Sequence, residues 1–354
     1  MKSFFKFFLI FTLLFVFLLS LAEIVTNYFK VNNLSEPINK SYASDELSFL
    51  KTFYLMEKGE NYYSAFKSAR LNLYKGDLLS SDTFVWRSPV VFWFWTIFAN
   101  NGYQILILFI LLGLGFLIAV FFVTKKITES VLLGIISVFL LVPYFYDTFV
   151  YKTAFLFTEW WGLFFYVYGL AFLIYKKNKF AIFFLTLAVI SRELFIIPVF
   201  LIFLYNFFSK KDSKIFLIPL FIFFIFTFIH SVFISKVTAE TTTFNVIDRF
   251  HRYSLDNLQR MVSFSMKSYV FLGMKTHYIF VFLGTISIFL GALIKKEIRY
   301  IFLSVIGFLI FLPMISTLDN DYWGIFFVTT LIMSIPFMIN LPRLFKKRQG
   351  LVDK

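Results

Sequence analysis

The feature of this sequence that most restricts its fold is a succession of apolar runs, most of them 15 to 22 residues long. Hydrophobic residues make up 60% of the 354 positions and charged residues 15%, which leaves too few polar side chains to cover a soluble domain. In lipid, only helices and closed barrels satisfy the backbone hydrogen bonds. The runs lack the alternation of a barrel strand, so they predict an all-α polytopic membrane protein.

We expect about ten transmembrane helices in a single integral membrane domain that covers 1–354. Two runs are short and meet at Arg192-Glu193, which predicts a pair of half-depth helices. The first run also fits a signal peptide with cleavage after Ala22, although its length favours a retained span. The predicted spans are 4–22, 103–123, 128–143, 153–175, 180–191, 194–208, 215–235, 276–294, 300–317 and 324–341.

Basic residues lie in six clusters, one at every second junction between the runs. The positive-inside rule places these clusters, and with ten crossings both termini, in the cytoplasm. The rule also accounts for the net charge of +14 without a nucleic-acid partner. Richness in Lys, Asn and Phe suggests a bacterial inner membrane. The clusters are Lys2/Lys6, Lys125-Lys126, Lys176-Lys177/Lys179, Lys210-Lys211/Lys214, Lys295-Lys296/Arg299 and Arg343/Lys346-Lys347-Arg348.

Two longer polar segments, 23–102 and 236–275, then lie on the outer side. The first contains an amphipathic helix over Asp45–Glu57 and ends in the aromatic segment that runs from Ser88-Pro89 to Trp95, which suits a membrane interface. The apolar face of the predicted amphipathic helix carries Leu47, Leu50, Phe53 and Tyr54.

Several kinds of site are excluded or weakened by composition. The chain has no cysteine, so disulfides and thiolate chemistry are excluded, and its three histidines are too scattered for a zinc site. It has no P-loop and no Gly-x-Ser-x-Gly elbow. The spans carry almost no midplane charge, which argues against a transporter or channel.

Three acidic or basic pairs could carry chemistry, and each has a structural alternative. Asp45-Glu46 is either a helix start, capped by Ser44, or a general base at the mouth of a membrane cavity. Arg192-Glu193 is either a local ion pair or a phosphate-binding arginine oriented by Glu193. Glu159 is either matched to Lys152 or contacts substrate.

Other candidates lie near the outer ends of the spans. Arg87 directly precedes the Ser88-Pro89 start of the interfacial segment. Asn320-Asp321 and Tyr322 form a solvated turn with an aromatic belt, or a sugar contact. Lipid headgroups are the ordinary partners of the remaining cations in these outer segments. Those cations are Arg249, Arg252, Arg260 and Lys275.

The order of these features resembles the GT-C fold glycosyltransferases, membrane enzymes that take a sugar from a polyprenyl-phosphate carrier. The resemblance covers most of the first 200 residues. In order, it rests on Asp45-Glu46, Gly59-Glu60-Asn61-Tyr62-Tyr63, Arg87-Ser88-Pro89 with the aromatic residues after it, Thr158-Glu159 and Ser191-Arg192-Glu193.

Two branches of that superfamily are similar to different parts of the chain. The acidic pair is similar to that of the protein O-mannosyltransferases. The basic-x-Pro segment is similar to that of the lipid A aminoarabinose transferases, where Lys-Pro-Pro is usual and this chain has Arg87-Ser88-Pro89. The sequence departs again at Asp321-Tyr322, where many members have Arg-Tyr. These departures leave the acceptor open.

The resemblance implies an inverting transfer of a sugar from a polyprenyl phosphate to a lipid, glycan or protein acceptor on the outer face. Asp45 would be the base, assisted by Glu46, or the two would bind Mg²⁺ or Mn²⁺. Arg87, Arg192 and Lys152 would bind the phosphate, with Lys275 as a further candidate. Glu159 and Glu193 would organise the site. Sugar or lipid contacts would come from Tyr62, Tyr63, Trp93 and Tyr322, beside Trp86 and Trp95, although an ordinary interfacial belt accounts equally for these aromatic residues.

A second class of function stays open, namely a polysaccharide polymerase or a flippase of lipid-linked oligosaccharides. A flippase predicts charges deep in the bundle, whereas the charges of this chain lie at the rim. A polymerase is compatible with the arginines of 236–275. The early Asp45-Glu46 pair favours the transferase.

Overall fold

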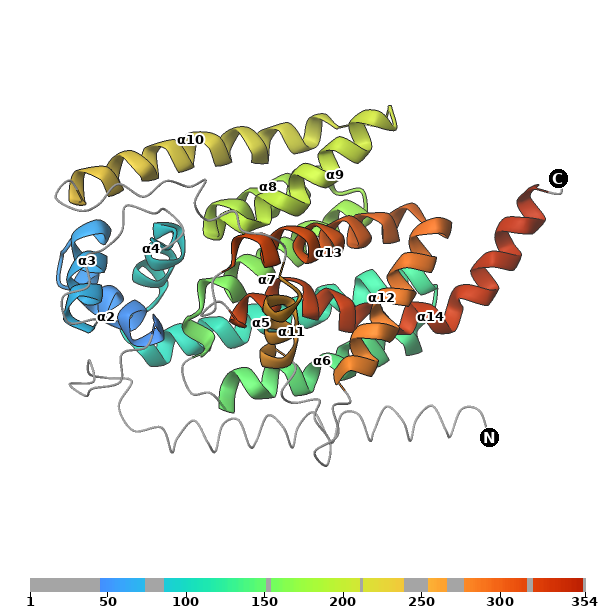
Figure 1. Cartoon of the computed structure of the whole chain (residues 1–354), viewed down its shortest axis with the longest axis horizontal. Coiled ribbons are helices and arrows are strands. Elements are labelled where there is room, and N and C mark those ends of the chain that lie inside the picture. The colour runs from blue at the N-terminus through green and yellow to red at the C-terminus, as the bar shows by residue number, and fades with distance from the viewer. Residues whose placement is uncertain are drawn as a thin grey trace.

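The computed structural model describes residues 45–73, 86–150, 154–210, 213–238, 254–265, 277–316 and 321–352. Every regular element in these ranges is a helix (Figure 1). In chain order the helices are α2 (Asp45–Glu57), α3 (Tyr62–Leu73), α4 (Pro89–Phe98), α5 (Gly102–Thr128), α6 (Val131–Val150), η1 (Ala154–Leu156), α7 (Thr158–Ile174), α8 (Asn178–Ser191), η2 (Glu193–Phe195), α9 (Ile196–Phe208), α10 (Lys214–Val237), α11 (Leu255–Ser265), α12 (His277–Ile294), α13 (Lys296–Ile315), η5 (Asp321–Gly324) and α14 (Ile325–Val352).

Four apolar segments of the described chain are long enough to cross a membrane. They are α5, α10, α13 and the segment Tyr322–Pro342, which joins η5 to the first part of α14. Six shorter apolar helices accompany them: α4, part of α6, α7, α8, the segment Glu193–Phe208, and α12. The all-helical prediction and the membrane character are therefore confirmed, whereas the number of ten spans stays a prediction. The first predicted span, 4–22, lies outside the described residues.

The helices pack on their sequence neighbours across short turns and also on helices far along the chain. α5 packs on α6, α7 on α8, α9 on α13, and α12 on α14. The predicted break at Arg192-Glu193 is confirmed, because α8 ends at Ser191 and the single turn η2 leads directly into α9. The core between these helices is rich in phenylalanine and tryptophan, with Trp161, Phe164 and Phe195 among its buried members.

The basic clusters that the structure describes lie at the turns between α5 and α6, α7 and α8, α9 and α10, and α12 and α13. Figure 1 shows these turns at the end of the bundle away from α2, α3 and α4. One contact joins two of the turns directly, since Lys295 Nζ donates to the Ile127 carbonyl oxygen at 2.7 Å and lies 3.2 Å from a Glu129 carboxylate oxygen. One end of the bundle is therefore basic, as the alternation of clusters predicts.

The opposite end carries the three short helices of the predicted loop 23–102. α2 has the predicted bounds, and Leu50 and Phe53 are buried as expected. Its buried face is nevertheless turned from the predicted one: it includes Ser48, Phe49 and Thr52, while Leu47 is only partly buried. The reason is that α2 packs on both α3 and α4, so protein surrounds more of the helix than a single interfacial face.

Candidate functional site

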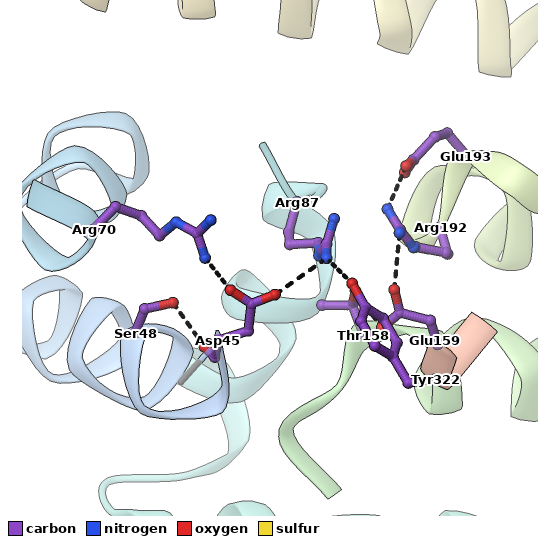
Figure 2. Close-up of polar contacts among 9 residues, drawn as sticks. All are labelled: Asp45, Ser48, Arg70, Arg87, Thr158, Glu159, Arg192, Glu193 and Tyr322. Carbon is purple, nitrogen blue, oxygen red and sulfur yellow. Dashed lines mark hydrogen bonds and ion pairs between the residues drawn. The ribbon is translucent and has the colours of Figure 1, made fainter. Parts of the chain in front are cut away.

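Asp45, in the first turn of α2, meets two arginines that come from other parts of the fold. One carboxylate oxygen of Asp45 pairs with Nη1 of Arg70 on α3, and the other lies 3.8 Å from Nη2 of Arg87, just before α4 (Figure 2). Ser48 Oγ donates to the Asp45 carbonyl oxygen at 2.7 Å, which holds the first turn of α2. Two cations thus face one carboxylate, whose side chain is 25% exposed.

Arg87 is buried, with 5% of the residue exposed. Its Nη2 donates to the Tyr322 hydroxyl at 2.6 Å, and its guanidinium lies 5.7 Å from the centre of the Phe49 ring. Burial alone would lower the pKa of Arg87, but the neighbouring oxygens of Tyr322, Glu159 and Asp45 outweigh it and raise the pKa. Arg87 is therefore a permanent positive charge held in place from several sides.

A second group of charges surrounds Arg192, which is fully buried where α8 ends. Its Nη2 lies 2.8 Å from a carboxylate oxygen of Glu159, in the first turn of α7, and its Nη1 donates to the Glu193 carboxylate. Glu159 is also fully buried. Within the described chain, Arg192 Nε and Nη2 have no hydrogen-bond partner, although Nη2 is within ion-pair distance of Glu159. One buried donor, Nε, thus remains available to an acceptor, since Nη2 already faces the Glu159 carboxylate.

The two groups lie next to each other. In Figure 2 the charged side chains follow one another from Arg70 through Asp45 and Arg87 to Glu159, Arg192 and Glu193. The negative charge of Glu159 acts on Arg87, which couples the groups electrically. We call these six residues the charged row. Its Arg70 side carries two cations and one anion, and its Arg192 side carries two anions and one cation.

The single turn η5 contacts two arginines of the charged row, Arg87 and Arg192. Tyr322 accepts the hydrogen bond from Arg87, and its ring stacks on Phe157 at 4.7 Å between centroids. The next residue, Trp323, lies under Arg192, with the guanidinium carbon 5.9 Å from the ring centre. Trp323 is 1% exposed, so this contact is shielded from solvent and lipid.

Tyr62 and Tyr63 begin α3; Tyr62 contacts the charged row directly, and Tyr63 packs against Tyr62. The Tyr62 hydroxyl donates to the Arg87 carbonyl oxygen, and the Tyr63 hydroxyl is 2.9 Å from Nδ1 of His230 on α10. Burial raises the pKa of Tyr62 well above its ordinary value and that of Tyr63 to about 12. Both phenols are therefore hydrogen-bonding scaffold groups at neutral pH.

The structure brings most of the sequence-predicted residues together, leaves one of them at the surface, and does not describe two others. Asp45, Arg87, Glu159, Arg192, Glu193, Tyr62, Tyr63 and Tyr322 all lie in or against the charged row. Trp93 does not join them, because it is 44% exposed on the surface of α4, while Trp86 and Trp95 are buried. Lys152 and Lys275 lie outside the described residues, so the predicted Glu159–Lys152 pair is untested and the partner observed is Arg192.

Three neighbours of the site were not predicted from the sequence. Arg70 lies 25 positions after its partner Asp45, in the last turn of α3 and beyond the Tyr62-Tyr63 motif at the start of that helix. His230 lies within a long apolar helix, and Trp323 belongs to a turn that was interpreted as an aromatic belt. Their partners come from distant parts of the sequence, so no spacing rule points to them.

The donor set of Asp45 and Glu46 does not fit a divalent cation. Each oxygen of Asp45 faces an arginine, and a cation there would meet two like charges. Glu46 is half-buried beside it in the first turn of α2. No group of three or more His, Asp or Glu side chains that could hold a metal ion occurs in the described ranges.

Chemically, the arrangement joins a partly exposed carboxylate to buried cations at the end of an apolar bundle. Such a set can bind an anion and present a carboxylate to a second molecule. The sequence has no match among the protein-family models, the curated proteins or the solved structures with which it was compared.

Proposed function

We propose that the protein is a membrane glycosyltransferase that moves a sugar from a polyprenyl-phosphate donor to an acceptor in the cell envelope. The observation that carries the proposal is the meeting of Asp45 with Arg87 at 3.8 Å, at the end of the bundle opposite the basic turns. By the positive-inside rule that end faces outward, where lipid-linked sugars of the envelope are used.

Cations are needed because the leaving group is a phosphate. Arg87 and Arg192 are buried, and their guanidinium groups would meet the negative charge that grows on the phosphate oxygen as its bond to the anomeric carbon breaks. Arg192 contributes Nε, a buried donor without a hydrogen-bond partner in the described chain, while its Nη2 is paired with Glu159. The low dielectric of the site makes such contacts stronger than they would be in water.

Asp45 is the base of the proposed reaction. Its carboxylate accepts the proton of the acceptor hydroxyl or amine while the acceptor oxygen or nitrogen forms the new bond to the anomeric carbon. Because one carboxylate acts and no covalent intermediate is needed, the sugar inverts its configuration. The Asp45 side chain is 25% exposed and that of Glu159 is fully buried, so an acceptor can reach Asp45 but not Glu159.

The test is transfer of a radiolabelled hexose from a polyprenyl phosphate to a crude envelope extract by the detergent-purified protein. Asp45→Asn and Arg87→Met are each expected to lower the rate by at least about a hundredfold, as the loss of a base or of an electrostatic contact does. Asp256→Asn is the matched control, because Asp256 is an exposed aspartate in the first turn of α11. Equal rates in Asp45→Asn, Asp256→Asn and wild type would reject Asp45 as the base.

A flippase or a polymerase of lipid-linked sugars is the competing function, and one observation favours it. Arg192 and Glu159 are fully buried, and buried charges occur in proteins that move polar headgroups through the bilayer. Liposomes with a fluorescent lipid-linked sugar separate the two functions. Translocation without transfer of label to any acceptor would favour the flippase, and elongation of a lipid-linked glycan would favour the polymerase.

A further inference from the structure

The contacts of η5 make this turn the common support of two arginines. Tyr322 accepts a hydrogen bond from Arg87 at 2.6 Å, and Trp323 packs under Arg192 at 5.9 Å. Because the two residues are consecutive in one short 3-10 turn, a shift of the turn moves both contacts together. The position of η5 therefore sets the relative position of Arg87 and Arg192.

Helix α11 holds η5 from the other side. It packs on η5 and on α13, and it buries Met261, Val262 and Ser265. A second contact fixes its other end, since Asn257 Nδ2 donates to the carbonyl and hydroxyl oxygens of Ser316 at 3.2 and 3.1 Å. α11 is thus attached at two places, to Ser316 just after α13 and to η5 just before α14.

Gly324 is the residue at which η5 packs directly on the backbone of α11. A Cβ atom at Gly324 would lie within 3.0 Å of the Met261 carbonyl oxygen and of Ser265 Oγ, closer than real Cβ atoms come to such neighbours. The Met261 oxygen belongs to the backbone, so it cannot turn aside as a side chain would. Any larger residue at 324 must push η5 and α11 apart.

We propose that Gly324 is a positioning residue through which α11 holds Arg87 and Arg192 in their working positions. Helix α11 thereby controls the relative position of two arginines that lie on other parts of the fold. The geometric part of this inference stands without the glycosyltransferase assignment; only its effect on transfer rests on the proposed function.

The first test measures the burial of the two arginines directly. Phenylglyoxal modifies accessible guanidinium groups, and mass spectrometry after digestion reports each arginine separately. Arg87 and Arg192, at 5% and 0% exposure, should react slowly in wild type. In Gly324→Ala both should react about tenfold faster, because the contacts of η5 open locally.

Two controls separate positioning from general loss of structure. Gly284→Ala also inserts a Cβ too close to a backbone oxygen, that of Leu331 at 2.6 Å, but in the contact between α12 and α14 rather than that between η5 and α11. It should leave Arg87 and Arg192 protected. Arg299, bonded to the Ala292 carbonyl oxygen and the Tyr205 hydroxyl, is the internal standard whose rate should stay unchanged in every variant.

A milder variant covers the case in which Gly324→Ala does not fold. Asn257→Ala removes the attachment of α11 to Ser316 and should also expose Arg87 and Arg192, to a smaller degree. Protection of both arginines at the wild-type level in a folded Gly324→Ala or Asn257→Ala protein would overturn the inference, as would equal exposure in Gly284→Ala.

The second test uses the transfer assay. Gly324→Ala should raise KM for the polyprenyl-phosphate donor by about tenfold or more, as misplaced binding groups do, and Gly284→Ala should not. If wild type transfers no sugar, the proposed function fails, while the phenylglyoxal result still decides the inference. If wild type transfers and Gly324→Ala keeps the wild-type KM, the positioning role fails.

Discussion

Arg87 donates a hydrogen bond to the hydroxyl of Tyr322 across 2.6 Å, although the two residues are 235 positions apart in the sequence. The bond joins the segment before α4 to the turn before α14, two segments that are far apart in the chain and meet beside the charged row. Both partners are buried. The site therefore depends on the whole helical assembly rather than on one loop.

Replacing Tyr322 by Phe should test this closure. The change removes an acceptor from a buried guanidinium, which costs about 1–3 kcal/mol of folding free energy. The midpoint of thermal unfolding in detergent should fall, and sugar transfer should fall with it. Tyr278→Phe is the control, because Tyr278 is 36% exposed and should tolerate the loss of its hydroxyl. Equal midpoints for the two variants would show that the Arg87 bond contributes nothing to stability.

The Glu159–Arg192 ion pair predicts a strongly non-additive pair of substitutions. Both side chains are fully buried, so Glu159→Met or Arg192→Met alone leaves a poorly compensated charge and should cost about 3–5 kcal/mol. The double variant removes both charges and should lose less than the sum of the two. Denaturant titration of all four proteins gives the coupling energy. Additive losses would show that the two groups do not interact.

Much of the fold was predictable because each helix shows its own pattern in the sequence. The apolar runs predict α5, α10, α12 and α13 to within a few residues, and the Arg192-Glu193 interruption predicts the α8–α9 break. The buried face of α2 was harder to predict. Its polar residues Ser48 and Thr52 are buried because their hydroxyls donate to carbonyl oxygens one turn earlier, which a hydrophobicity pattern does not register.

The candidate site was predictable only at its charged residues, which stand out because a charge among apolar neighbours is energetically costly in a membrane protein. Arg192, Glu159 and Arg87 are conspicuous against apolar neighbours, and the structure brings them to one end of the bundle. Their partners were not predictable, since Arg70 and Trp323 look like ordinary polar and interfacial residues. Trp93 was predicted as a sugar or lipid contact from its place in an aromatic segment, but it lies on the exposed face of α4.

Tyr63 predicts a loss of stability at high pH. Its pKa is about 12 in the folded protein, against about 10 in an unfolded chain, so between these values only the unfolded state releases the proton. The stabilisation is therefore complete below pH 10 and falls as the pH rises toward 12. Tyr63→Phe should lose about 1 kcal/mol at neutral pH with the His230 hydrogen bond, but should decline less steeply above pH 10. Unfolding midpoints from pH 8 to 12 test this, and parallel curves would contradict it.

Lys176 should be a site where one substitution stabilises the protein without touching the charged row. It follows the end of α7 with φ of 58°, and its amide donates to the Leu173 carbonyl oxygen at 3.0 Å, as in a left-handed helix cap. A lysine side chain is strained in this conformation and glycine is not, so Lys176→Gly should raise the free energy of unfolding by about 1 kcal/mol.

Lys177→Gly is the matched control, because it removes one charge from the same basic turn at φ of −92° and relieves no strain. Denaturant midpoints should rise in Lys176→Gly and not in Lys177→Gly, with transfer rates unchanged in both, since this turn lies at the end of the bundle away from Asp45. A fall in the Lys176→Gly midpoint would mean that the charge, rather than the backbone conformation, determines stability at this turn.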